Sequence, residues 1–368
     1  MNVNRDLKPI RARDRLKLEK TTARVVDDMN DSSDIPPGGP LREILGHCQE
    51  FVLPAYQDAD ESSKKYQRRY RRRAISVAIL GSAAVLLATF ELSNLSFYLP
   101  ILRERPWLVT TLEVLAGLST LLFVLFGMGA SLKQQWLLAR FKAESLRLLK
   151  FASLHEAGFW NGDSLNLRTC KKRICDKVEE IVSSSFEELE EWVTKGRIPR
   201  IVCAPPTKSI GKESLEELVV YYQKKRLDIQ CSYLRDASQR DRQNDRRTRM
   251  MPPVLFFGSV SFVLAHLSVE VVNGSETWWN RFLILLAAAM PAMGAGFRIY
   301  RSANESARNA SRFKATHHVL LRLSERLDAA KNATDVQGVF REIGFCEQVL
   351  ESDHREWMRL MVEAEWFG

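Results

Sequence analysis

The feature that most restricts the fold of this chain is the gathering of its apolar residues into four long stretches. The first is Ala74 to Phe90, which holds no charged residue, and the second runs from about Trp107 to Leu132 with one acid, Glu113. The third covers about Met250 to Val272 and the fourth about Trp278 to Tyr300. Each is close to the ~20 residues that an α-helix needs to cross ~30 Å of hydrocarbon. Buried core helices of a large soluble domain are the alternative, but runs this long without an amphipathic period favour membrane spans.

The composition of the whole chain hides this segregation. Of its 368 residues 27% are charged, and the formal net charge is +9, values that a soluble protein can have. Residues Met1 to Pro40 carry many charges and no apolar core of a secretory signal, so we expect the internal stretches to direct insertion themselves. The predicted fold class is therefore all-α: an integral membrane protein whose four transmembrane helices form two hairpins, with long cytoplasmic helical extensions.

Basic residues flank the four stretches on one side only. Clusters of Arg and Lys precede the first and third stretches and follow the second and fourth, whereas the connectors Glu91 to Pro106 and Val272 to Trp278 are nearly balanced in charge. The positive-inside rule then places both termini in the cytoplasm and leaves Trp107, Trp278 and Trp279 at the outer interface. The residues assigned to this topology and lipid-headgroup role are Arg68, Arg69, Arg71, Arg72 and Arg73 before the first stretch, and Arg246, Arg247 and Arg249 before the third.

The run YQRRYRRR before the first stretch also has the composition of a nucleic-acid-binding patch. Because it directly abuts a span, a topology determinant that contacts anionic lipid is the favoured interpretation. That interpretation also accounts for the high net charge. We therefore expect the lipid bilayer, and no nucleic acid, as the partner of this surface.

The sequence shows no signature of an active site. It has no P-loop, dinucleotide-binding fingerprint, nucleophile elbow or HExxH pair. Its six histidines have no ligand spacing, and its six cysteines fall on the predicted cytoplasmic side, where thiols stay reduced. Cys170 and Cys175 lack the nearby Cys or His partners that a metal site needs. We expect a protein that is not an enzyme and has no catalytic residue, metal or cofactor.

The order of features in the first part of the chain recurs in the second. Each part has a basic helix, an apolar stretch, a short connector, a second apolar stretch and a long helical region. Arg140 to Ala143 and Arg312 to Ala315 share the sequence RFKA, and the same interval separates Trp107 from Trp279. Glu-Trp pairs at 191–192 and 356–357 recur after a slightly shorter interval. We interpret this as a tandem duplication; a chance match of four residues is the alternative.

The duplication sets the predicted domains. The segment PRIVCAPPTKSIG interrupts helical periodicity and is interpreted as the linker between the copies. The N-terminal region, with its Pro- and Gly-rich stretch at 36–40, is expected to be mostly flexible. The predicted organisation is a flexible segment 1–50, a first two-span unit 51–197, a linker 198–215 and a second two-span unit 216–368.

Two stretches of the first predicted unit also carry a family resemblance. The stretch RFKAESLRLLKFASLHEAGFW, Arg140 to Trp160, follows a predicted hairpin, and a later acidic helix ends in FEELEEW, Phe186 to Trp192. They resemble the SLATT superfamily, two-transmembrane effector modules of bacterial conflict and anti-phage systems. The resemblance covers about Tyr66 to Lys195 and is weaker over Leu218 to Trp366, where the acidic residue of AESLR is lost.

The resemblance implies a location and a role. The location is the bacterial inner membrane, and the role is a homo-oligomeric effector that forms a pore or otherwise compromises that membrane during an anti-phage response. It also implies a nucleotide-signalling or sensor protein as a partner. A non-conducting membrane scaffold that recruits a cytoplasmic partner is the first alternative, and an ordinary ion channel is the second.

Ionisable residues within the stretches are the candidates for a conducting path, because such groups are costly at membrane depth. Glu113 lies about two turns into the second stretch, and His266 and Glu270 lie one turn apart in the third. The alternatives are residues that reach interfacial water, or an internal pair of Glu113 with a base such as Arg103 or Arg105. Small or helix-bending residues assigned to helix packing are Gly127 and Gly129 in the second stretch, and Pro291, Gly294 and Gly296 in the fourth.

The predicted cytoplasmic helices each carry one apolar stripe, at 178–192, 319–327 and 339–361. A helix with a single stripe must bury it against another helix. Pairing within one subunit and pairing between subunits both satisfy this requirement, and they can coexist.

Overall fold

The computed structural model describes residues 28–31, 38–92, 104, 107–129, 132–160, 164–195, 210–273, 277–304 and 306–363. These residues form helices joined by short turns and contain no strand. The all-α fold class predicted from the sequence is confirmed for this part of the chain.

The described helices fall into two halves with the same order of elements. The first half contains α2 (Gly39–Leu92), α4 (Trp107–Gly129), α5 (Leu132–Ser153), α6 (Ala157–Trp160), α7 (Ser164–Ser183) and α8 (Phe186–Thr194). The second half contains α9 (Lys212–Tyr222), the π-helical turn η2 (Gln223–Leu227), α10 (Asp228–Arg249), α11 (Met251–Asn273), α12 (Trp278–Asn304), α13 (Ser306–Asn332) and α14 (Val336–Glu363). In each half a long helix leads into an apolar hairpin, and the hairpin returns to further helices. The two halves thus share one order of elements, and their origin by duplication stays a prediction.

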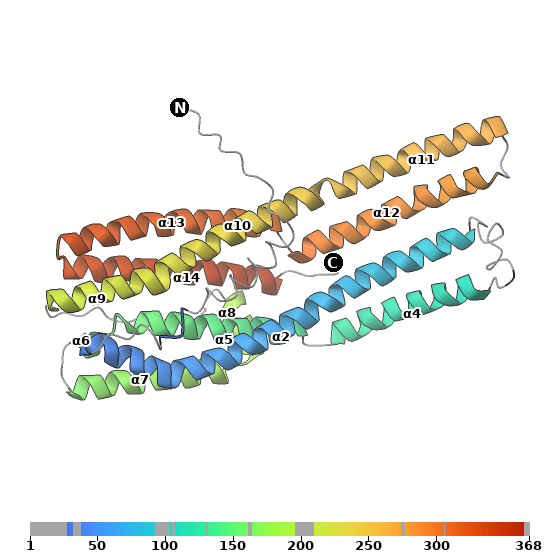
Figure 1. The fold of residues 1–368 in the computed structure, drawn as a ribbon. Helices are drawn as coiled ribbons and strands as arrows, with labels where there is room; N and C mark the ends of the chain where they lie inside the picture. Colours follow the sequence, from blue (N-terminus) through green and yellow to red (C-terminus); the bar gives the residue numbers. More distant parts are fainter. Residues whose placement is uncertain are drawn as a thin grey trace, which may run out of the picture.

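Long continuous helices connect a helical body to the apolar hairpins. Helix α2 has 54 residues, and at ~1.5 Å per residue it is about 80 Å long, more than twice the thickness of a bilayer core. In the second half, Lys212–Val272 form a continuous helical run of 61 residues. Figure 1 shows the hairpins α2/α4 and α11/α12 extending from the same end of the body.

Three of the described helices are long and apolar enough to cross a membrane: those within Gly39–Glu91, Lys212–Val272 and Trp278–Arg298. They contain the first, third and fourth apolar stretches of the sequence. Helix α4 has 23 residues, and within it Trp107–Ser119 forms a shorter apolar helix. Large apolar side chains of these helices face outward, among them Leu115, Leu118, Phe257, Leu264 and Val271. An apolar surface of this extent is typical of a protein that lies in lipid.

The four hairpin helices pack side by side in a single row, so not every helix contacts every other. Helix α4 packs against α2, α2 against α12, and α12 against α11. Among the described residues, α4 and α11 are not a packed pair, and Figure 1 shows α2 and α12 between them. The two outer helices of the row are therefore α4 and α11.

The body is held together by a core that both halves share. Its fully buried side chains include Ile44 of α2, Leu146 of α5, Tyr222 of α9, Leu320 of α13 and Ile343 of α14. The apolar stripes of the body helices thus pack within one subunit, as one of the two predicted arrangements requires. The core also joins the halves, so neither half of the body is an independent unit.

A second, smaller cluster lies at the end of the body from which the hairpins emerge (Figure 1). The Glu-Trp pairs noted in the sequence meet there: Trp192 of α8 contacts Phe141, and Trp357 of α14 contacts Trp136 edge-on. Tyr70 of α2 stacks on Trp136 from the other side. The recurrence of these aromatic residues is therefore explained by one shared packing site.

Two predicted domain boundaries are wrong. The flexible segment was expected to reach residue 50, but α2 begins at Gly39, and Leu41, Leu45 and Cys48 are buried. These residues recur every three to four positions and form one apolar helix face, which the neighbouring Pro- and Gly-rich stretch concealed. The linker was expected to end at residue 215, but α9 begins at Lys212 and Leu215 is buried. Residues 1–27, 32–37 and 196–209 lie outside the described residues.

Candidate functional site

Glu113 lies on α4 beside an acid of α2, not beside a described base. Its side chain is half-buried and hydrogen-bonds the side chain of Glu91. Thr110 Oγ1 also donates to Glu91 Oε1 over 2.8 Å. The alternative partners Arg103 and Arg105 lie outside the described residues.

His266 and Glu270 lie on the same face of α11, as their spacing requires, and His266 Nε2 is 3.6 Å from Glu270 Oε2. The other ring nitrogen of His266 hydrogen-bonds Asn280 Oδ1 of α12, and Asn280 is almost completely buried. The sequence analysis missed Asn280, because a polar residue next to the predicted interface has no periodic signal. This contact joins the two helices of the second hairpin.

The structure does not bring the predicted polar residues of the two hairpins together. Glu113 lies on α4 and the pair His266 and Glu270 on α11, and these are the outer helices of the row (Figure 1). Within one chain, they cannot line the same narrow path.

The residues assigned to helix packing differ in their surroundings. A Cβ atom added at Gly296 of α12 would lie 3.1 Å from Ser82 Oγ of α2, so Gly296 marks the contact between the two hairpins. A Cβ atom at Gly294 would lie 3.9 Å from Leu255 Cβ of α11, an ordinary contact distance. Helix α12 continues through Pro291, whose ring is exposed. The remaining pair, Gly127 and Gly129, lies in the last turn of α4, where the side chains are outside the described set.

The predicted headgroup arginines lie at the junction between body and hairpins. On α2 they precede the apolar part of the helix, and on α10 they precede α11, and Figure 1 shows both helices leaving the body at the same end. Most are solvent-exposed: Arg68, Arg69, Arg71, Arg72, Arg246, Arg247 and Arg249. Arg73 is half-buried. This position is compatible with contact with lipid headgroups.

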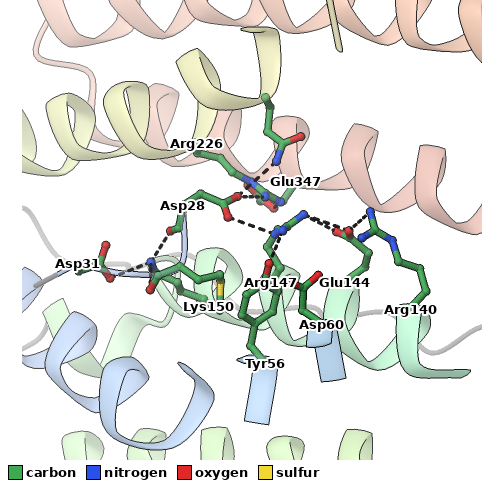
Figure 2. A network of polar contacts seen from close by, with 12 residues as sticks. Asp28, Asp31, Tyr56, Asp60, Arg140, Glu144, Arg147, Lys150, Arg226 and Glu347 are labelled. Atoms are coloured by element: carbon green, nitrogen blue, oxygen red, sulfur yellow. Dashed lines mark hydrogen bonds and ion pairs between the residues drawn. The ribbon is translucent and has the colours of Figure 1, made fainter. Parts of the chain in front are cut away.

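A buried ion network inside the body is the most distinctive site, and the sequence analysis missed it (Figure 2). It joins side chains of both halves to a short segment, residues 28–31, that forms neither helix nor strand. Its cations are Arg140, Arg147 and Lys150 of α5 and Lys225 and Arg226 of η2, and its acids are Asp28, Asp31, Glu144 of α5 and Glu347 of α14. Most of these groups are almost inaccessible to solvent, so their charges must be neutralised within the protein.

Lys150 is the centre of the contact with residues 28–31. Its ammonium donates to the carbonyl oxygens of Asp28, over 2.6 Å, and Met29, over 3.1 Å, and forms an ion pair of 2.7 Å with Asp31. All three of these contacts are made with the segment. Burial lowers the pKa of Lys150, and the Asp31 carboxylate opposes that effect.

The second half holds the same segment from the opposite side. Tyr221 donates to Asp31 Oδ1 over 2.8 Å, and Lys225 donates to the carbonyl oxygen of Asn30 over 3.0 Å. Asp28 Oδ2 lies 3.3 Å from both Arg226 Nη1 and Gln230 Nε2. Figure 2 shows Asp28 between Arg226 on one side and Arg147 on the other.

Arg226 is also anchored to α14 and to α5. It forms a two-point contact with Glu347, with distances of 2.9 Å from Nε to Oε1 and 2.7 Å from Nη2 to Oε2. Tyr222 donates to the same carboxylate over 2.7 Å, and the guanidinium lies 4.3 Å from the ring centroid of Phe151. A bidentate pair of this kind has a strongly preferred geometry. The π-helical turn that carries Arg226 is therefore fixed in orientation.

Mutual neutralisation shifts the protonation equilibria of the network. Burial alone would raise the pKa of Glu144, but the guanidinium groups of Arg140 and Arg147 lower it to about 2. Burial alone would lower the pKa of Arg147, but Asp28 and Glu144 raise it above its ordinary value. Both groups are therefore charged at neutral pH. Breaking one such buried pair costs about 3–5 kcal/mol, because the remaining charge loses its partner.

Part of the network was visible in the sequence. Arg140, Glu144 and Arg147 follow one another at helical spacing within the RFKAESLR motif, and Glu144 is the acid that the second RFKA segment lacks. Asp28 and Asp31 carried no such signal, because their partners lie more than a hundred residues away in the chain.

The described residues hold no group of three or more His, Cys, Asp or Glu side chains placed to bind a metal ion. Among the described cysteines, Cys48, Cys170, Cys175, Cys231 and Cys346 are not joined in disulfides. Cys203 lies outside the described residues. The network described above is built of ion pairs and hydrogen bonds within the protein.

Comparison with known proteins gives no match. No family model, curated protein or solved structure is similar to this chain. The resemblance to the SLATT superfamily therefore stays a prediction that rests on the sequence motifs alone.

Proposed function

We propose that this chain is a four-span membrane effector that oligomerises and opens a conducting path through, or otherwise compromises, the bacterial inner membrane. The observation that carries the proposal is the pair of apolar hairpins, which lie side by side, expose apolar side chains and carry ionisable groups at membrane depth. The resemblance to SLATT modules supplies the anti-phage role and the nucleotide-signalling or sensor protein as the partner that would act on the body.

We include α4 as the fourth span because of the helix it packs against and the side chains it exposes. It packs against the apolar part of α2, and its side chains Leu112, Val114, Leu115 and Leu118 are exposed. A helix with such a surface is more stable in lipid than in water. Two hairpins cross the membrane an even number of times, which keeps the whole body on one side, and the arginines at the junction favour the cytoplasmic side.

Topology is tested by thiol labelling in a background without native cysteines. A cysteine introduced at Ser275, in the second outer connector, should react with an impermeant reagent in intact cells. A cysteine introduced at Lys172, which is exposed on the body, should react only after the cells are opened. Native Cys170 and Cys346 are poor reporters, because both are buried in the core whichever side it faces. Labelling at Lys172 from outside would overturn the orientation.

Oligomerisation follows from the row of helices. One row of four does not enclose a wide path, and its polar residues lie on the two outer helices. When copies pack head to tail, α4 of one copy meets α11 of the next, and these are the two helices that carry Glu113 and the pair His266 and Glu270. A closed ring of such copies would have a polar lining that one chain lacks. A strictly monomeric particle in several mild detergents would contradict this step.

Conduction is tested directly with the purified chain in lipid vesicles that contain an ion-sensitive dye. We expect ion flux that rises steeply with the protein-to-lipid ratio, and in cells we expect depolarisation and growth arrest on overexpression. Absence of flux and of depolarisation, with abundant and correctly inserted protein and under phage challenge, would reject the effector. That outcome would favour the non-conducting scaffold.

A further inference from the structure

We propose that residues Asp28 to Asp31 form an internal latch that holds the membrane hairpins in a closed arrangement, and that its release is the activating step. We define the latch as this four-residue segment together with the cations that bind it. The inference rests on the proposed function for its consequence, because it assigns the regulation of the same conducting path. The latch itself can be tested without conduction.

The first argument is the way in which the segment is held. Asp28, Met29 and Asp31 are each at most 1% exposed, although the segment has no helix or strand to support it. Its described attachment consists of ion pairs, of bonds from cationic side chains to its backbone carbonyls, of the bonds from Tyr221 and Gln230, and of the packing of Met29 in the core. Contacts of this kind separate as a unit when the segment moves away, since no ladder of secondary structure must be broken.

The second argument is what the latch connects. Lys150 and Arg147 lie on α5, which directly follows α4 in the chain. Lys225 and Arg226 lie in η2, which is part of the continuous helical run that ends in α11. The latch therefore joins the extensions of the two outer hairpin helices, which carry Glu113 and the pair His266 and Glu270. A change in the latch therefore acts on α11 through one continuous helical run, and on α4 through α5, the next described helix in the chain.

The third argument is the π-helical turn itself. A π-helix is rare and occurs mostly as a single turn at functional sites. Here the turn directs Lys225 to the carbonyl oxygen of Asn30 and Arg226 to Asp28. Two of its three basic side chains, Lys225 and Arg226, thus contact the segment at the point where the long helix departs from α-helical geometry. Loss of the segment would remove the Asn30 carbonyl oxygen and the Asp28 carboxylate, which are the partners of these two side chains.

The fourth argument concerns the buried cations that would lose partners if the segment were released. Without the segment, Arg147 would keep its ion pair with Glu144 and Arg226 its ion pair with Glu347. Lys150 would lose two hydrogen-bond acceptors, the carbonyl oxygens of Asp28 and Met29, and its ion pair with Asp31. Uncompensated buried cations repel one another and draw in water. With the segment bound, the interface between the halves is closed. Without the segment, the closed form is unstable, so the interface has the two states that a switch requires.

A native cysteine provides the readout. Cys48 of α2 is 2% exposed, and its pKa is raised to about 11, mainly by burial. Lys150 and Asp31 are among the charges that act on it, so it lies next to the latch. Cys170 of α7 is also buried, and its thiol donates to Glu156 Oε1 over 3.4 Å. Release should expose Cys48 and leave Cys170 protected.

The experiment compares alkylation of the two thiols in the full-length protein, in lipid vesicles, for wild type and the double variant Asp28→Asn with Asp31→Asn. We expect alkylation of Cys48 to be roughly tenfold faster in the variant, with Cys170 unchanged. The matched control is Asp60→Asn, the same substitution at an acid drawn in Figure 2 that pairs with the exposed Lys64 instead. It should leave Cys48 protected.

Ion flux in the same vesicles separates the two proposals. Faster reaction of Cys48 together with higher flux supports both, and faster reaction without flux supports the latch and contradicts the conducting path. Higher flux with Cys48 still protected supports the path and overturns the latch, and an unchanged protein overturns it as well. If Cys170 also becomes reactive, the double variant has unfolded, and Asp31→Asn alone decides. Reaction of Cys48 without Cys170 in that variant supports the latch, and any other pattern rejects it.

Discussion

Helix α5 of the first half and helix α13 of the second each follow an apolar hairpin and each contain the segment RFKA, yet they handle charge differently. In α5, Arg140 pairs with Glu144 one turn later on the same helix. In α13, the corresponding Arg312 pairs with Asp353 of α14 over 3.3 Å. Thr316, at the position of Glu144, donates to the same Asp353 over 3.1 Å. The acid that pairs with the arginine thus lies on the same helix in the first half and on the neighbouring helix, α14, in the second half.

The difference continues along the two helices. At the interval that separates the RFKA segments, Lys150 corresponds to Arg322, which is exposed, and His155 corresponds to Leu327, which is buried in the core. The first half therefore has a face of buried charge where the second has a conventional apolar stripe with its base in water. Similar segments in one chain thus form unlike sites, because residues outside the shared motif determine which groups are buried.

The largest expected effect tests this contrast directly. Lys150→Met should lower the free energy of unfolding by about 3–5 kcal/mol, because Asp31 and two buried carbonyl oxygens lose their cation. Arg322→Met, the same change at the corresponding exposed position, should stay within ~0.5 kcal/mol of wild type. Thermal unfolding in detergent, followed by tryptophan fluorescence, measures both. Equal effects would mean that the two faces are energetically alike.

The second prediction concerns acid. Burial lowers the pKa of His155 to about 4, and burial likewise lowers the pKa of His354 to about 4. Between pH 6.5 and 4 the unfolded chain binds protons that the folded chain does not, so stability falls as the pH falls. From pH 7.5 to pH 5 the expected loss is on the order of 2 kcal/mol for each group.

The variant His155→Gln should remove about half of this acid sensitivity, and the matched change His318→Gln, at an exposed histidine of α13, should remove none. Denaturant unfolding curves at several pH values give the comparison. A slope that is the same in wild type and His155→Gln would show that His155 is not neutral in the folded protein.

The sequence predicted the helical class and the positions of the apolar helices, because both depend on local signals. A run such as Ala74 to Phe90 is apolar at every position, and an amphipathic stripe repeats every three to four residues. The buried stripe of Leu41, Leu45 and Cys48 has the same signal, but the adjacent Pro- and Gly-rich stretch hid it. The fourth span, α4, remains a prediction.

The candidate site was much less predictable. Arg140, Glu144 and Arg147 are close in sequence, so their spacing revealed one charged helix face. Asp28 and Asp31 meet Lys150 and Arg226 only in the folded chain, and two acids near the N-terminus have no periodic pattern. The row of hairpin helices was equally hidden, since no local rule states which helix of one hairpin packs against the other.

The third prediction compares the two hairpins. In Glu113→Gln the amide can still donate to Glu91, so the contact between α4 and α2 survives while the ionisable group is lost. If Glu113 lines a conducting path, ion selectivity should change about fivefold, equivalent to ~1 kcal/mol, with insertion and oligomer size unchanged. Electrical recording from planar bilayers measures the selectivity.

Glu270→Gln is the matched variant on the second hairpin. A change in selectivity in both variants would support a shared lining at the contact between copies, whereas a change in Glu113→Gln alone would place the path at the first hairpin. If Glu113 only forms an exposed pair with a base, the variant should lose ~1 kcal/mol of stability or less and keep its selectivity.

The smallest expected effect concerns the contact between the hairpins. In Gly296→Ala the new methyl group would lie 3.1 Å from Ser82 Oγ, tighter than an ordinary contact, so the Ser82 side chain or the two helices must shift by a few tenths of an ångström. In Gly294→Ala the nearest atom, Leu255 Cβ, is at 3.9 Å, and no movement is needed. We expect Gly296→Ala to lower stability by about 1 kcal/mol, at the low end for an overpacked contact, and Gly294→Ala to be neutral. Adding Ser82→Gly should restore Gly296→Ala, because it removes the opposing hydroxymethyl group. Thermal unfolding of the two single variants and the double variant decides the matter: if Ser82→Gly fails to restore stability, the two hairpins do not meet at Gly296.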